Sequence, residues 1–84
     1  MPRFPQTDYF RHTRQRPDRA GILDDWIERA IRQPEHEEIQ SDGRTRRWVR
    51  IPAFDNRALR VILLQDGQTV HNAFFDRDYE KRRT

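Results

Sequence analysis

The apolar residues between positions 22 and 31 recur three or four residues apart, the spacing that places side chains on one face of an α-helix. They are Ile22, Trp26, Ile27, Ala30 and Ile31. Asp24 and Asp25 stand near the start, where acidic side chains stabilise the positive end of the helix dipole. Asp25 and Glu28 have the spacing of a capping box, and Pro34 supplies the stop. The pattern predicts an amphipathic helix with one buried face.

The residues ahead of this helix predict a shorter one. Thr7 or Asp8 can act as its N-cap. Its inner side would hold Tyr9, Phe10 and Thr13. Pro17 should end or kink the helix near Arg16, because a proline ring clashes with the preceding turn. Residues 1–6 have no periodicity, and we expect them to be a flexible tail.

The second half of the chain changes to the alternation of β-strands. Strand-like segments occupy 35–40, 45–54, 58–65 and 69–76, of which the first is a polar edge and the third is apolar on both sides apart from Arg60. The turn signals SDGR and DGQ join consecutive segments as hairpins. The chain therefore predicts an α+β fold, with two N-terminal helices followed by a four-stranded antiparallel meander sheet.

The 84 residues are enough for one domain, 1–84, with a charged tail over 78–84. No cysteine is present, so neither disulfides nor thiolate metal sites can hold the fold together. No apolar run approaches the ~20 residues of a membrane span, and the N-terminus does not read as a signal peptide. We expect a cytoplasmic protein without a membrane partner.

Charge is distributed unevenly along the chain, which carries a net charge of +3. Residues 21–42 are acidic, whereas residues 1–20 and 43–64 are rich in arginine. Arginine offers a planar donor fork that suits phosphate and carboxylate, although a GC-rich genome would produce the same bias. This basic protein is expected to present a basic face to an anionic partner.

Several short motifs occur in a fixed order from residue 9 to residue 77. They are His12 with Arg16, Arg19 ahead of AGI, the helix DDWIERAIR with its QP stop, and then DGRTRRWVRI, LRVILL and VHNAFFD. In this order the chain resembles a small bacterial family allied to the BrnT and RelE toxins of toxin–antitoxin systems. The resemblance implies a RelE/barnase-like fold.

As function, the resemblance implies a RelE-like endoribonuclease toxin that needs no metal, or an RNA-binding relative. Such an enzyme makes the ribose 2′-hydroxyl attack the adjacent phosphate, which requires a base, an acid and cations. His71 and His12 are the candidates for proton transfer, because the pKa of histidine lies near 6.5. Arg16 and Arg60 are the catalytic candidates for the phosphate, and Arg50 is expected beside them there. The implied partners are RNA, which could be bound to the ribosome, and a cognate antitoxin with an acidic or amphipathic segment.

Each catalytic candidate also has a structural interpretation. By alternation His71 shares a face with Thr69, Ala73 and Phe75, so it could pack in the sheet. His12 and Arg16 share one side of a helix and could simply be solvated. Arg60 interrupts an apolar strand, and a buried charge is costly unless paired. Its partner would be either a phosphate or an internal carboxylate such as Asp76 or Glu28.

Arg46 and Arg50 flank Trp48 on one face of the second strand-like segment, and Arg77 follows the last one. Cations around an aromatic ring are typical of surfaces that bind RNA. These four residues are therefore the candidates for RNA binding. Alternatively, Trp48 packs under a helix while the arginines cover its rim.

No motif indicates a cofactor. His36 lies among three glutamates, but neighbouring strand positions point to opposite faces, so we expect no metal site and interpret the segment as a solvated acidic edge. Two functions outside catalysis stay open. One is a protein-interaction module whose arginines meet an acidic partner, and the other is a basic protein that binds RNA without cutting it.

Overall fold

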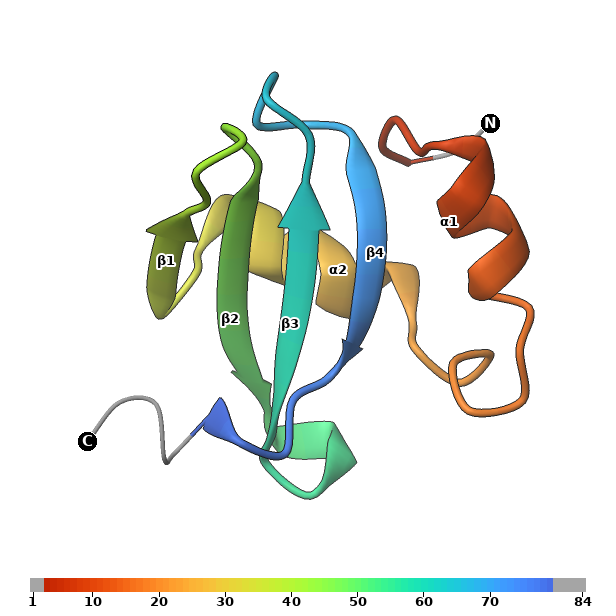
Figure 1. Ribbon diagram of the computed structural model, residues 1–84. Helices are drawn as coiled ribbons and strands as arrows, with labels where there is room; N and C mark the ends of the chain where they lie inside the picture. The colour runs from red at the N-terminus through yellow and green to blue at the C-terminus, as the bar shows by residue number, and fades with distance from the viewer. Residues whose placement is uncertain (1–2, 80–84) are drawn as a thin grey trace.

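A computed structural model describes residues 3–79 and has the predicted α+β architecture (Figure 1). The helices are α1 (Asp8–Thr13) and α2 (Asp24–Arg32), followed by the strands β1 (His36–Ile39), β2 (Thr45–Ile51), β3 (Arg57–Leu63) and β4 (Val70–Phe75). A short 3-10 helix, η1 (Pro52–Phe54), lies between β2 and β3. The strands form one antiparallel sheet in the order β1-β2-β3-β4, which confirms the meander.

Helix α2 covers one face of the sheet, as Figure 1 shows behind the strands. Its side chains Ile27 and Ala30 are completely buried, while Trp26 and Ile31 lie at the margin of the core. The sheet contributes the core residues Val49, Ile51, Leu59, Val61, Leu63, Val70 and Ala73. The helical face predicted from the spacing is therefore correct, with Ile27 at its centre.

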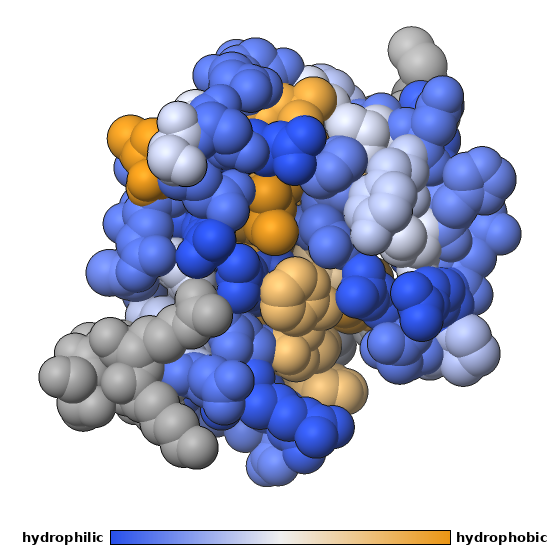
Figure 2. All heavy atoms as spheres, viewed as in Figure 1, coloured by the Kyte–Doolittle hydropathy of each residue, from blue (hydrophilic) through white to orange (hydrophobic). Residues whose placement is uncertain are grey.

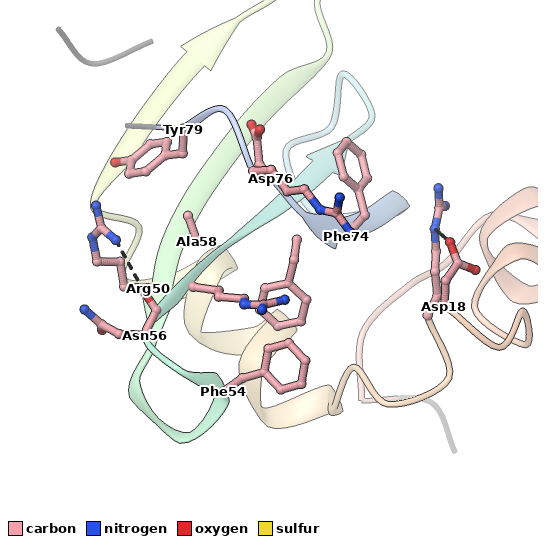
Figure 3. Close-up of a pocket in the computed structure, with 12 residues that line it drawn as sticks. Asp18, Arg50, Phe54, Asn56, Ala58, Phe74, Asp76 and Tyr79 are labelled. Atoms are coloured by element: carbon pink, nitrogen blue, oxygen red, sulfur yellow. Dashed lines mark hydrogen bonds and ion pairs between the residues drawn. The ribbon is translucent and has the colours of Figure 1, made fainter. Parts of the chain in front are cut away.

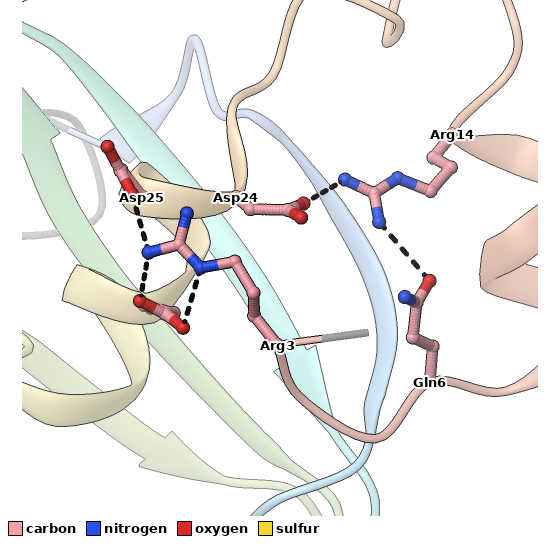
Figure 4. Close-up of polar contacts among 6 residues, drawn as sticks. Arg3, Gln6, Arg14, Asp24 and Asp25 are labelled. Atoms are coloured by element: carbon pink, nitrogen blue, oxygen red, sulfur yellow. Dashed lines mark hydrogen bonds and ion pairs between the residues drawn. The ribbon is translucent and has the colours of Figure 1, made fainter. Parts of the chain in front are cut away.

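The start of α2 differs from the expected capping box. Leu23 occupies the N-cap position and makes no side-chain hydrogen bond there. Asp25 and Glu28 instead bind the guanidinium group of Arg3, with nitrogen–oxygen distances of 2.5 and 2.6 Å (Figure 4). Both carboxylates therefore bind the positive charge of Arg3. They connect the N-terminal segment to α2 and do not cap the helix.

The expectation of a flexible tail over residues 1–6 is wrong for residues 3–6. Phe4 is only 6% exposed and belongs to the core. The backbone continues beside β4, where the Thr7 amide donates to the Val70 carbonyl at 3.0 Å and the Val70 amide donates to the Pro5 carbonyl at 2.9 Å. Periodicity did not indicate this segment because a single buried aromatic residue leaves no pattern.

Helix α1 follows directly and flanks the outer edge of β4 (Figure 1). Thr7 is its N-cap, as expected, and its hydroxyl accepts from the Phe10 amide at 3.1 Å. The helix ends at Thr13, three residues before the end near Arg16 that Pro17 predicted. Turns then follow as far as Gly21. Arg14, just past the end, binds Gln6 and Asp24 and so ties this helix to the start of α2 (Figure 4).

The second face of the sheet is covered by neither α1 nor α2. We call it the open face. On β2 it carries Arg46, Trp48 and Arg50, as the alternation predicted. Viewed from this side, hydrophobic side chains form a band down the middle of the sheet, bordered by strongly hydrophilic ones (Figure 2).

Candidate nucleic-acid interface on the open face

Strand register sets the side chains of the open face in rows. Trp48, Arg60 and Phe74 pair across β2, β3 and β4 in the middle row. Toward the end of β4, Arg50 pairs with Ala58, and the Asp76 amide donates to the Ala58 carbonyl at 2.9 Å. The small side chain of Ala58 therefore lies between larger charged neighbours and leaves room above it.

Trp48 does not form the exposed stacking surface that the RNA-binding prediction requires, because its side chain is completely buried. Tyr79 stacks on it with ring centroids 5.7 Å apart and an interplanar angle of 26°. The indole Nε1–H donates to Asp76 Oδ2 at 2.9 Å. The cover comes from the segment after β4. The sequence predicted a charged tail from residue 78 onward. This prediction is wrong at Tyr79, which is buried, and residues 80–84 lie outside the residues that the structure describes.

Arg60 has the internal carboxylate partner that one interpretation of the sequence expected. Its Nη1 lies 3.8 Å from Asp76 Oδ2, and both side chains are largely buried. The guanidinium group also lies between two rings, 5.6 Å from the centroid of Trp48 and 5.2 Å from that of Phe74. Glu28, the other suggested partner, binds Arg3. Asp76 therefore joins Trp48 and Arg60 into one polar cluster.

A pocket of about 700 Å³ opens at the end of the sheet beside Ala58 (Figure 3). Its lining comes from β2, β3, β4, η1 and three further segments, namely the α1–α2 loop, the turn between η1 and β3, and the residues after β4. The lining residues that carry charge or an aromatic ring are Asp18, Arg19, Arg50, Phe54, Arg57, Phe74, Phe75, Asp76, Arg77 and Tyr79. Residues that are distant in the sequence thus meet in one hollow, which we call the basic pocket.

The charge of the basic pocket is positive. Four arginines and two aspartates line it, so the formal sum is four minus two, or +2. Asp76 is engaged by Arg60, and Asp18 lies 3.9 Å from Arg19. Arg50 donates to the Asn56 carbonyl at 3.3 Å, which holds it along the rim. The arrangement favours an anion with several negative oxygens.

The sequence predicted only part of this pocket. Arg50 and Arg77 were RNA-binding candidates and do line it, whereas Arg46 lies further along β2, 3.9 Å from Glu38. Sequence reasoning missed Arg19 and Arg57 as pocket residues, together with the aromatic wall. Both arginines stand beside turns, where no periodic pattern shows which way a side chain points.

His71 occupies a β-bulge, which corrects the alternation assumed for the last strand. Leu63 pairs with Val70 while Ile62 pairs with Asn72, so His71 is an extra residue. Val70 and Ala73 consequently share the core face, which strict alternation forbids. The imidazole stacks on Tyr9 with centroids 4.9 Å apart, and its Nδ1 lies 3.2 Å from Thr7 Oγ1. His71 thus packs between β4 and α1.

The four catalytic candidates are not gathered in the basic pocket, since none of them lines it. His12 is exposed on α1, and no hydrogen bond or ring contact within residues 3–79 joins it to His71. Arg16 is exposed in the turn after α1, 3.8 Å from Asp18. Arg60 lies in the middle of the open face. A shared proton-transfer centre of His71 and His12 has no support in this arrangement.

His36 lies 3.2 Å from Glu38, and no group of three or more acidic or histidine side chains in the described part of the chain could hold a metal ion. None of the described helices has the length and apolar character to cross a bilayer. Comparisons with protein-family models, with curated proteins and with solved structures give no match.

Burial, and secondarily the positive charge of Arg44, lowers the pKa of His71 below its usual 6.5. The unfolded chain then takes up a proton at higher pH than the folded one, so stability is fully present above about pH 6.5 and is lost as the pH falls through the folded pKa. We expect His71→Leu to fold and to lose less stability than the parent between pH 7 and pH 5. Urea unfolding across this range measures the difference, with exposed His12→Gln as the control. Equal slopes in parent and His71→Leu would show that His71 does not titrate differently on folding.

Proposed function

We propose that the protein binds RNA, as a relative of the RelE/BrnT-like toxins, and that the basic pocket receives the phosphate backbone. The observation that carries this proposal is the meeting of four arginines from four separate segments around one hollow. They are Arg19 before α2, Arg50 on β2, Arg57 on β3 and Arg77 after β4. Guanidinium groups bind phosphate bidentately, and several of them around one concavity hold an anion more strongly than scattered surface charges do.

RNA cleavage is the second candidate. The observation in its favour is the lowered pKa of His71, since a neutral imidazole is the form that a general base requires. The basic pocket, however, has no histidine among its lining residues. Binding therefore ranks ahead of cleavage, and the toxin interpretation with its antitoxin partner depends on finding cleavage.

We expect the double variant Arg57→Gln/Arg77→Gln to bind single-stranded RNA more weakly than the parent and with a flatter salt dependence. Each lost phosphate contact removes about 0.7 from the slope of log K against log salt, so two contacts remove roughly 1.4. Fluorescence anisotropy of a labelled 12-nucleotide RNA at several salt concentrations, in EDTA, measures both quantities. Gel analysis of the same samples detects metal-free cleavage.

The matched control is Arg29→Gln/Arg32→Gln, which removes the same charge from exposed positions on α2, behind the sheet. Its binding should change only by the small general effect of lower net charge. If both double variants lose affinity equally, the pocket has no special role. Binding of a polyglutamate peptide with higher affinity than RNA would instead favour the protein-interaction module.

A further inference from the structure

One wall of the basic pocket is aromatic. It consists of Phe54, Phe74 and Phe75 at the end of the sheet, where Phe74 lies on the open face and Phe75 on the side of α2. Phe54 is 39% exposed, and its ring lies nearly parallel to that of Phe75, with centroids 4.4 Å apart and an interplanar angle of 22°. In Figure 3 the Phe54 side chain lies below Ala58, among the residues that line the pocket. The wall thus offers flat apolar surface at a place where the surrounding charges already favour an anion.

The rings are held in place from behind and by the backbone. Trp26 of α2 lies 5.8 Å from Phe54 and 6.1 Å from Phe75, measured between ring centroids. After Phe54 the chain passes through two successive left-handed residues, Asp55 with φ 59° and Asn56 with φ 53°. This conformation is uncommon outside glycine, and asparagine and aspartate tolerate it best. The sharp turn returns the chain to β3 and leaves Phe54 against Phe75.

Each end of the aromatic wall has a cation beside it. The guanidinium carbon of Arg57 is 5.6 Å from the Phe54 centroid, and that of Arg19 is 5.4 Å from the Phe74 centroid. Arginine at this distance holds a ring by a cation–π contact. Arg19 also donates from Nη1 to Asn72 Oδ1 at 2.6 Å, and Nε of Arg57 lies 4.0 Å from Asp55 Oδ2. Each guanidinium has five N–H donors, more than these contacts use. The pocket therefore places flat apolar surface and phosphate-binding groups side by side, as the base and phosphate of one nucleotide require.

We propose that the aromatic wall takes an unpaired base, so that the RNA bound in the basic pocket is single-stranded. This inference rests on the proposed function and adds the class of RNA. In a duplex the bases are stacked on one another and only their edges and the backbone are accessible, whereas single strands can place a base on an aromatic side chain. A volume of about 700 Å³ is within the range of pockets that enclose a small ligand.

The test compares three forms of one 12-nucleotide RNA at a single salt concentration: the intact strand, the strand with abasic sites, and its duplex. The parent protein should bind the intact strand about tenfold more tightly than the other two, the order that base–aromatic stacking contributes. Phe54→Ala should lose that preference and keep the salt slope of the parent. Tyr9→Ala is the matched control, because it removes an exposed ring outside the pocket.

Equal binding of all three RNAs by the parent would overturn the inference and leave the proposed function standing. Absence of binding to any RNA would overturn both. Displacement of the strand by adenosine monophosphate at comparable concentration would assign the pocket to free nucleotides and also overturn the inference. The comparison of intact, abasic and duplex RNA needs only the parent protein, so the test holds even if Phe54→Ala does not fold.

Discussion

Replacing Trp48 by alanine is expected to lower the free energy of unfolding by about 3–5 kcal/mol, the usual cost of truncating a large aromatic residue in a core. Trp48 has no exposed surface, and its removal leaves a cavity beneath Tyr79. It also takes the indole N–H away from Asp76. Urea denaturation followed by circular dichroism measures the loss.

Two further variants separate the contributions of Trp48. Trp48→Phe keeps most of the ring volume but not the hydrogen bond, so its loss should be smaller than that of Trp48→Ala. Trp26→Ala removes a half-buried indole from the margin of the core and should also cost less. A Trp48→Ala protein with the stability of the parent would mean that Tyr79 does not hold the ring in solution.

Asp76→Ala is expected to cost about 3–5 kcal/mol, the range found when one partner of a buried ion pair is removed. The change takes the Asp76 carboxylate away from the largely buried guanidinium group of Arg60 and from the Trp48 N–H. It also removes an acceptor from the Asp78 amide. The same denaturation experiment gives the value.

Asp78→Ala is the control, since Asp78 is exposed and lies only two residues away. It should unfold close to the parent. Adding Arg60→Met to Asp76→Ala should restore part of the stability, because the buried charge that faced Asp76 is then removed as well. If Asp76→Ala is no worse than Asp78→Ala, groups other than Asp76 stabilise the Arg60 guanidinium.

The fold could be predicted from the sequence because its elements rest on local patterns. The helical spacing around Ile27 and the alternation of β2 each bury one face, and the turn signals at Gly43 and Gly67 coincide with positive φ angles of 89° and 70°. Arg60 could also be interpreted in advance, since a charge in an apolar strand requires a partner. That partner proved to be one of the two suggested carboxylates.

The site was harder to predict because it depends on contacts between distant residues. The β-bulge at His71 moves the later side chains of β4 to the opposite face from the one that alternation from Val70 would give them. No residue within 69–76 indicates a bulge. Tyr79 was assigned to a tail, yet it covers Trp48. Arg19 and Arg57 enter the basic pocket only because the loop before α2 and the turn after η1 meet at one end of the sheet.

The two outer strands of the sheet differ in a way that limits self-association. The N-terminal segment pairs with β4 at Val70, and α1 flanks the same edge, while β1 has no strand beyond it among residues 3–79. Molecules can join edge to edge into a continuous sheet only if each has two free edge strands. A molecule with one free edge strand can form only a closed two-fold dimer by this route. In such a pair Glu37 and Glu38 of both molecules would face each other across the joint. The native sheet is thus covered at the β4 edge, while the β1 edge carries two glutamates that form ion pairs with Arg47 and Arg46 of β2.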